Sequence, residues 1–251
     1  MVPLAKEIFR SRRVTTVDGS ATLPIRDETP EHVVEFLKSI VVRTKARATA
    51  EVGLAFGLSA LSICEGLREN GGGRHIAVDF YQNTAFSGIG VENVRRAGFG
   101  DLLEFREELS YVALPQMLAE RTQLDFAYID GWHTFDYALV DFFFLDLLLH
   151  VGGIVAIDDC SFQGVHAVCR YIARNRAYRV IGVSEDITSW RASKTRQMLE
   201  LAVRSNRTLR RVVKSEFLHT DLSMGFTRDT RCIAFEKIAS DERTWDTHHE
   251  F

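Results

Sequence analysis

The sequence predicts an α/β fold in which helices cover both faces of a mostly parallel, doubly wound sheet. From residue 48 to residue 183, short apolar segments alternate with longer segments of helical periodicity, as in repeated βαβ units. Two of the short segments, Phe126–Ile129 and Ile154–Ile157, are almost entirely apolar, which is typical of strands buried on both faces. The length of 251 residues suits one domain, residues 1–251, with appendages.

A helix precedes the first strand. Thr29 and Pro30 form a typical helix start, with Thr29 as the N-cap and Pro30 at the first helical position. The helix is expected to reach about Thr44, because apolar residues recur on one face: Val33, Val34, Leu37, Ile40 and Val41. Residues 1–45 thus form an N-terminal segment and helix, of which residues 1–29 follow no clear pattern.

The central region supplies the alternating elements, which glycines separate. Strands are expected at Ala48–Val52, His75–Val78, Leu103–Arg106, Phe126–Ile129, Ile154–Ile157 and Tyr178–Val183. Helices are expected at Leu58–Glu69, Gly88–Ala97, Val112–Arg121, Phe135–Leu149 and Gly164–Asn175. Gly71–Gly73 and Gly152–Gly153 are interpreted as turns, and Gly98 as the end of a helix.

The alternation stops after Val183. Residues 184–228 are expected to form a helical insertion, because Ser189–Lys214 is basic and amphipathic. Arg231–Ile238 has strand character and is expected to be the last strand.

Composition and charge argue against several classes of partner. The chain has 31 Lys and Arg against 34 Asp and Glu, a net charge of -3, so no overall positive field favours nucleic acid or anionic lipid. The longest apolar stretch, residues 142–151, contains Asp146 and His150 and is too short to span a membrane. Phe142–Phe144 within it is a candidate contact in a homo-oligomer.

Cysteine spacing predicts a cytoplasmic protein with reduced thiols. The four cysteines are widely separated and form no Cys-x-x-Cys pair, which argues against a zinc ribbon or a thioredoxin-type site. A disulfide framework is not expected at this length and density. The cysteines are Cys64, Cys160, Cys169 and Cys232.

A glycine-containing loop after the first central strand predicts nucleoside binding. The segment from Glu51 to Ser59 includes Gly53 and Gly57, which allow a sharp turn and a close approach of ligand to backbone at a helix start. Asp79 follows the next strand, where a carboxylate can bind ribose hydroxyls. These features fit both NAD and S-adenosylmethionine (SAM), although the glycines do not form Gly-x-Gly-x-x-Gly.

Three aspartates predict a cation site at the same edge of the sheet. Asp130 follows the strand Phe126–Ile129, and Asp158 and Asp159 follow Ile154–Ile157. Converging carboxylates repel one another, and a divalent cation, Mg²⁺ by ligand type, removes that penalty. Adjacent strand residues point to opposite faces, so sharing one ion requires the chain to leave strand geometry there. His133 is suited to accept a proton at neutral pH.

The order of these residues resembles class I SAM-dependent methyltransferases. The resemblance consists of Glu51-x-Gly53-x-x-x-Gly57-x-Ser59, then Asp79, Asp-Gly-x-His at 130–133, Gly152-Gly153 and Asp158-Asp159. More narrowly, the chain resembles metal-dependent O-methyltransferases of macrolide-sugar, cephamycin and aminocoumarin-sugar biosynthesis, and distantly catechol O-methyltransferase. The resemblance covers roughly residues 33–183 and implies a Rossmann-like seven-stranded sheet with an antiparallel last strand.

The resemblance also implies roles for the residues in that pattern. Glu51 and the glycine loop with Ser59 would hold the methionine end of SAM. Asp79 would hold the ribose, and the segment from Glu108 to Ser110 would lie near the adenine.

The same resemblance implies a catalytic centre. Asp130, Asp158 and Asp159 would bind Mg²⁺ or another divalent cation, with Asp130 also close to the cofactor and active in catalysis. His133 would be the base.

The implied reaction is methyl transfer from SAM to a hydroxyl of a small molecule. A sugar hydroxyl, a catechol-like diol and a phenol remain open as acceptors, and neither nucleic acid nor membrane is expected as a partner. Two alternatives remain. An NAD-dependent oxidoreductase would explain the glycine loop and Asp79 but not the aspartates, and a non-catalytic nucleoside-binding methyltransferase-like domain would be expected to have lost the aspartates.

Overall fold

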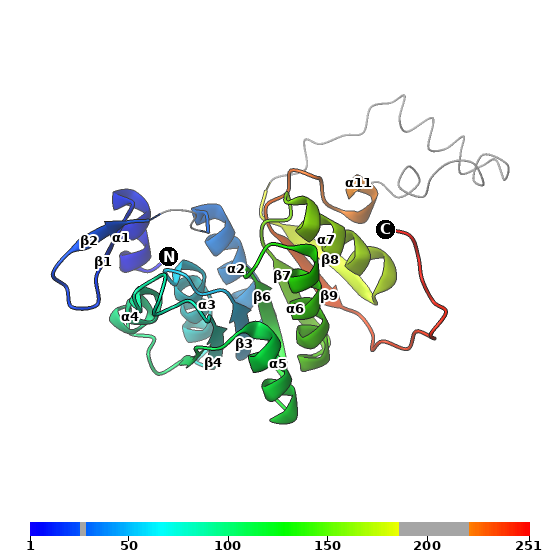
Figure 1. The fold of residues 1–251 in the computed structure, drawn as a ribbon, viewed down its shortest axis with the longest axis horizontal. Helices are drawn as coiled ribbons and strands as arrows, with labels where there is room; N and C mark the ends of the chain where they lie inside the picture. The colour runs from blue at the N-terminus through cyan, green and yellow to red at the C-terminus, as the bar shows by residue number, and fades with distance from the viewer. Residues whose placement is uncertain (26–28, 186–220) are drawn as a thin grey trace.

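A computed structural model describes residues 1–25, 29–185 and 221–251. Its main sheet has seven strands in the order β5-β4-β3-β6-β7-β9-β8 (Figure 1). They are β3 (Ala48–Val52), β4 (Arg74–Val78), β5 (Leu103–Arg106), β6 (Leu124–Ile129), β7 (Leu149–Ile157), β8 (Tyr178–Val183) and β9 (Ile233–Lys237). Only β9 is antiparallel to its neighbours, β7 and β8. The predicted doubly wound sheet with an antiparallel last strand is confirmed.

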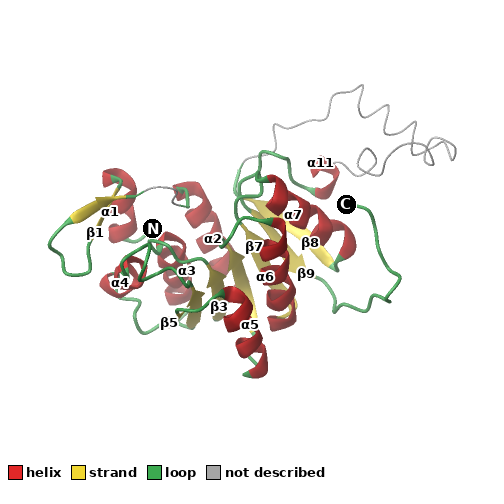
Figure 2. Ribbon diagram, viewed as in Figure 1, coloured by secondary structure: helices red, strands yellow, loops and turns green. Residues whose placement is uncertain are grey.

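Helices cover both faces of the sheet (Figure 2). One core contains α1 (Pro3–Ser11), α2 (Glu31–Thr44), α3 (Leu58–Glu69) and α4 (Ile89–Arg96), and the other contains α5 (Ser110–Ala119), α6 (Phe135–Leu148) and α7 (Gln163–Asn175). Along β6, Tyr128 belongs to the first core and Ile129 to the second, because successive strand residues point to opposite faces. No helix among the described residues is both long and apolar enough to cross a membrane.

The parallel strands bring the chemically important loops to one edge of the sheet. β4, β3, β6 and β7 are consecutive parallel neighbours, so the loops that follow them leave the sheet at the same edge. Ligands of open α/β sheets bind at this carboxyl edge. The segments that begin at Gly53, Asp79, Asp130 and Asp158 all start there.

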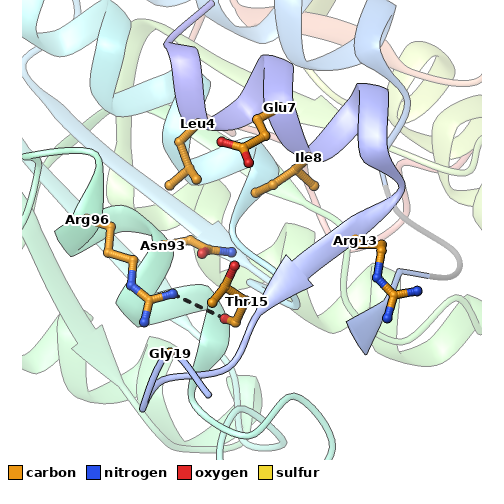
Figure 3. A pocket seen from close by; sticks show the side chains of 8 residues that line it. All are labelled: Leu4, Glu7, Ile8, Arg13, Thr15, Gly19, Asn93 and Arg96. Atoms are coloured by element: carbon orange, nitrogen blue, oxygen red, sulfur yellow. Dashed lines mark hydrogen bonds between the residues drawn. The ribbon is translucent and has the colours of Figure 1, made fainter. Parts of the chain in front are cut away.

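The N-terminal 25 residues form structure that the sequence does not predict. After α1, the strands β1 (Arg13–Thr15) and β2 (Thr22–Pro24) form an antiparallel hairpin. Arg96 of α4 donates a hydrogen bond of 3.2 Å to the carbonyl of Thr15, and a cavity of about 260 Å³ lies between α1, the hairpin and α4 (Figure 3). Strands of three residues are too short for a periodic sequence pattern to reveal them.

The prediction that Thr29 caps α2 is wrong. The helix begins at Glu31 with Pro30 in the N-cap position, and no side chain of the described residues caps it. The Thr29 hydroxyl instead donates to the Oδ2 of Asp130, at 3.1 Å. A charged acceptor on another loop offers a stronger hydrogen bond than the amides of the helix end.

The predicted turn at Gly152–Gly153 is also wrong, because both residues lie inside β7. Gly152 has a φ of +91°, and the register between β6 and β7 shifts between Leu124 and Phe126. Glycine here accommodates an irregularity within a paired strand, which a sequence pattern does not distinguish from a turn.

Most of the predicted helical insertion, including Ser189–Lys214, lies outside the described residues. Within residues 184–228 the structure describes the short helix α11 (Asp221–Met224), and Asp221 contacts His166 and Arg170 of α7. Of the predicted oligomer contact, Phe142 is buried and Phe143 is exposed, and oligomerisation stays a prediction. All four cysteines are buried free thiols.

Candidate active site

The loop after β3 packs so closely against two neighbouring segments that two positions require glycine. A Cβ on Gly53 would lie 2.1 Å from the backbone oxygen of Asp130, and a Cβ on Gly57 would lie 2.7 Å from that of Gly90. Both glycines also have a positive φ, +93° and +80°. The glycine loop, residues 53–57, is therefore tightly packed between the Asp130 turn and the start of α4.

Asp79 fixes the shape of this glycine loop. Its Oδ2 accepts hydrogen bonds from the backbone N–H groups of Leu54 and Ala55, at 3.1 and 2.9 Å. Its Oδ1 accepts one from the N–H of Tyr81, at 2.9 Å. The carboxylate thus already has three backbone donors, and the expected contact with a ribose stays a prediction that would use the remaining acceptor capacity of Oδ1.

Asp130 and Asp159 meet at the imidazole of His133. The Nε2 of His133 lies 3.4 Å from the Oδ1 of Asp130 and 3.1 Å from the Oδ2 of Asp159. One potential ligand atom from each of the three residues lies within 4.8 Å of the others. Asp159 has a φ of +52°, so the chain leaves strand geometry directly after Asp158, as a shared site requires.

Asp158 is held by an arginine that the sequence does not reveal as a site residue. The Nε and Nη2 of Arg231 lie 3.2 and 3.3 Å from the two carboxylate oxygens of Asp158, whose side chain is fully buried. The Nη1 of Arg231 lies 2.9 Å from the Oδ1 of Asp159. The guanidinium therefore neutralises part of the charge that the aspartates bring together.

The pKa of Asp130 lies well above that of an ordinary aspartate. Burial, followed by the charge of Asp158, raises the pKa of Asp130 to about 7, although the imidazole of His133 opposes this shift. The hydroxyls of Thr29 and Tyr128 both donate to its Oδ2, at 3.1 and 3.2 Å. In turn, the hydrogen bond to Asp130 raises the pKa of His133. The site is thus a coupled set of charges in which a further cation would be stabilised.

Comparison with known proteins identifies the family of this chain. The profile of a methyltransferase domain family matches residues 50–160, which include the glycine loop and the aspartates. Tapetum-specific methyltransferase 1 of Arabidopsis thaliana is 32% identical over 166 residues, which cover 64% of this chain and 67% of that protein. The chain belongs to the class I SAM-dependent O-methyltransferases.

Other relatives of this O-methyltransferase agree with the assignment. A caffeoyl-CoA O-methyltransferase-like protein of Arabidopsis thaliana is 28% identical over 192 residues, or 76% of this chain and 75% of that protein. The assignment decides against the NAD-dependent alternative.

Solved structures share the fold of this O-methyltransferase. An O-methyltransferase from Bacillus cereus in complex with SAH matches with a TM-score of 0.55 and 21% identity, over 93% of this chain and 90% of that one. TomG from Streptomyces achromogenes, in complex with SAM, matches with a TM-score of 0.51 and 14% identity, over 85% and 82%.

Glu51 is the predicted cofactor residue that lies deepest in this O-methyltransferase. Its side chain is fully buried, its Oε2 accepts from the hydroxyl of Ser59 at 2.7 Å, and its Oε1 lies 3.1 Å from the Nε2 of His75. Direct contact with a methionine moiety would require these pairs to open. In the described arrangement, Glu51 holds the side chain of Ser59 in the first turn of α3, and its contact with the cofactor stays a prediction.

The predicted adenine segment lies at the same sheet edge. Glu108 and Ser110 follow β5, which neighbours β4, and both side chains are partly buried. Ser110 is the first residue of α5. The loop after β4 therefore lies between this segment and the glycine loop, which is consistent with a nucleoside that extends along the sheet edge. Contact between the segment and the adenine stays a prediction.

Three polar residues of the site escaped sequence analysis. Thr29 carries the signal of a helix cap, Arg231 that of a strand start, and Gln82 follows Asp79 in a segment without a recognisable pattern. Each makes contacts to residues far away in the chain, which no local pattern encodes.

Proposed function

We propose that this O-methyltransferase transfers the methyl group of SAM to a hydroxyl of a small molecule, with a divalent cation bound at Asp130 and Asp159. The observation that carries the proposal is the convergence of these carboxylates and His133 beside the glycine loop. A nucleoside-binding domain without catalysis would have no use for buried carboxylates whose mutual repulsion must be balanced.

The donor set fits a divalent cation. Two carboxylates that follow adjacent parallel strands offer the oxygen ligands that Mg²⁺ and Mn²⁺ bind. Asp158 was expected as a third ligand, and that role would require Arg231 to release it. When bound, the cation would bind one or two acceptor oxygens and lower the pKa of the hydroxyl.

The side chains of this site supply alignment and proton transfer. The methyl group of SAM is already activated, so the protein needs to hold the acceptor oxygen in line with the methyl–sulfur bond. We assign the hydroxyl proton to the imidazole of His133. Trp132 and Phe162 lie beside the cluster with 60% and 50% of their surface exposed, which favours an acceptor with an apolar or aromatic face.

Binding and turnover together test the cation. Methyl transfer from SAM is measured for a catechol, a phenol and a sugar diol, with and without chelator, and Mn²⁺ and SAH binding are measured by calorimetry. Asp159→Asn should lose turnover and Mn²⁺ affinity but keep SAH affinity, whereas Asp158→Asn should keep most Mn²⁺ affinity. Full turnover of the wild type in excess chelator would refute the cation role.

His133→Ala separates a base from a ligand. If His133 is the base, turnover falls about 10²- to 10⁴-fold while Mn²⁺ affinity is kept. Loss of Mn²⁺ affinity in this variant would instead make His133 a ligand and contradict the base assignment.

A further inference from the structure

The side chain of Gln82 connects the glycine loop to α4. Its Nε2 donates to the carbonyl of Ala55 at 2.9 Å, and its Oε1 accepts from the N–H of Gly90 at 2.9 Å. Gln82 is fully buried, although it lies in the loop after β4. Gly90 is in the first turn of α4, where the backbone N–H has no partner within the helix, so Gln82 satisfies a donor that would otherwise be buried unpaired.

The carbonyl that Gln82 holds belongs to a strained residue. Ala55 has a φ of +46°, in the left-handed region that is unfavourable for every residue with a Cβ. Its N–H is held by Asp79 at 2.9 Å and its carbonyl by Gln82. Both peptide groups of the strained residue are therefore fixed by buried side chains of one loop.

A side chain of α4 itself makes a further contact with the glycine loop. Asn93, one helical turn after Gly90, donates from its Nδ2 to the carbonyl of Phe56 at 3.0 Å. Gln82 and Asn93 thus hold two consecutive carbonyls of the glycine loop. The backbones are close enough that a Cβ on Gly90 would lie 2.3 Å from the oxygen of Ala55.

We propose that Gln82 is a positioning residue for cofactor binding, which holds Ala55 in its left-handed conformation so that the glycine loop has its binding shape before SAM arrives. Fixing a loop in its bound conformation lowers the entropic cost of binding. The proposal rests on the glycine loop being the SAM site, as the sequence predicts.

Calorimetry with SAH tests the proposal in a double-mutant cycle. Gln82→Met keeps the length of the side chain but removes its hydrogen bonds to Ala55 and Gly90 and the longer one, of 3.4 Å, to the Oδ2 of Asp79. It should raise the dissociation constant about tenfold. Adding Ala55→Gly should recover most of that loss, because glycine adopts a positive φ without strain. The affinity of Ala55→Gly alone is the reference against which the double variant is compared. Asn83→Ala, at the exposed neighbouring position, is the matched control.

The rescue separates positioning from a general loss of structure. A Gln82→Met affinity within twofold of wild type, or a loss that Ala55→Gly does not recover, would overturn the role of Gln82. Gln82→Asn, which retains an amide but is too short to span both partners, provides the same measurement should the methionine variant fail to fold. In the wild type, SAH should slow hydrogen exchange at Leu54–Gly57. If SAH does not protect these amides, the glycine loop is not the cofactor site, and the proposal for Gln82 fails with it. If SAH protects them but the affinity of Gln82→Met is unchanged, the loop is the cofactor site and only the role of Gln82 is refuted.

Discussion

Replacing Arg231 with Met should destabilise the fold by leaving a buried charge without its partner. The side chain of Asp158 is fully buried, and Arg231 contacts both of its oxygens and one oxygen of Asp159. Breaking a buried pair from one side costs roughly 3–5 kcal/mol. Because 30% of the Arg231 side chain is exposed, water can enter, and we expect the lower limit of about 3 kcal/mol.

Urea and thermal denaturation measure this loss. For a domain of this size, about 3 kcal/mol corresponds to a decrease in Tm of roughly 6–12 °C. Arg179→Met is the matched control, since Arg179 pairs with Glu236 while 65% of its side chain is exposed, and its loss should cost about 0–1 kcal/mol. The double variant with Asp158→Asn should regain much of the stability, because the buried charge is then gone.

Two results would refute this reasoning. One is an Arg231→Met variant as stable as the Arg179→Met control. The other is a double variant no more stable than Arg231→Met, which would mean that the loss does not arise from the unpaired Asp158.

Two further predictions concern Asp141 and Gly53. Burial raises the pKa of Asp141 to about 6, so the folded state binds this proton more tightly than the unfolded state, and its contribution to stability is lost as pH rises from about 4 to about 6. The free energy of unfolding of Asp141→Asn should therefore exceed that of the wild type by up to about 3 kcal/mol at pH 7, but not at pH 4. Urea titrations that give the same difference between variant and wild type at both pH values would contradict this. Gly53→Ala places a Cβ 2.1 Å from the oxygen of Asp130, and it should lower Tm and abolish SAH binding, whereas calorimetry showing wild-type affinity would disprove the packing argument.

The alternating part of the chain was predictable because its strands are local patterns. Four of the six strands expected between residues 48 and 183 begin and end within one residue of the observed ones, as for Ala48–Val52, and Phe126–Ile129 begins two residues late. β7 differs most, because its first half contains Gly152 and lacks the apolar run of its second half. The hairpin of β1 and β2 was missed, since it is held by contacts such as that of Arg96 with Thr15.

In the candidate site, likewise, some features could be predicted from the sequence and others could not. Asp79, Asp130 and Asp159 were predictable because each follows a strand, and parallel strands bring their carboxyl ends to one edge. The groups that these carboxylates contact were not predictable from the sequence. Asp79 was expected to face a ribose, yet it accepts from backbone donors of the glycine loop.

The sequence by itself determined the order of strands and helices, the glycine loop and the set of aspartates, because periodicity and turn chemistry depend on neighbours in the chain. Only the tertiary structure decided how the charges are shared. Thr29 reaches Asp130 across 101 positions and Arg231 reaches Asp158 across 73. Such pairs form where folding brings side chains together, and the energy of a carboxylate depends on the groups that surround it rather than on its place in the sequence.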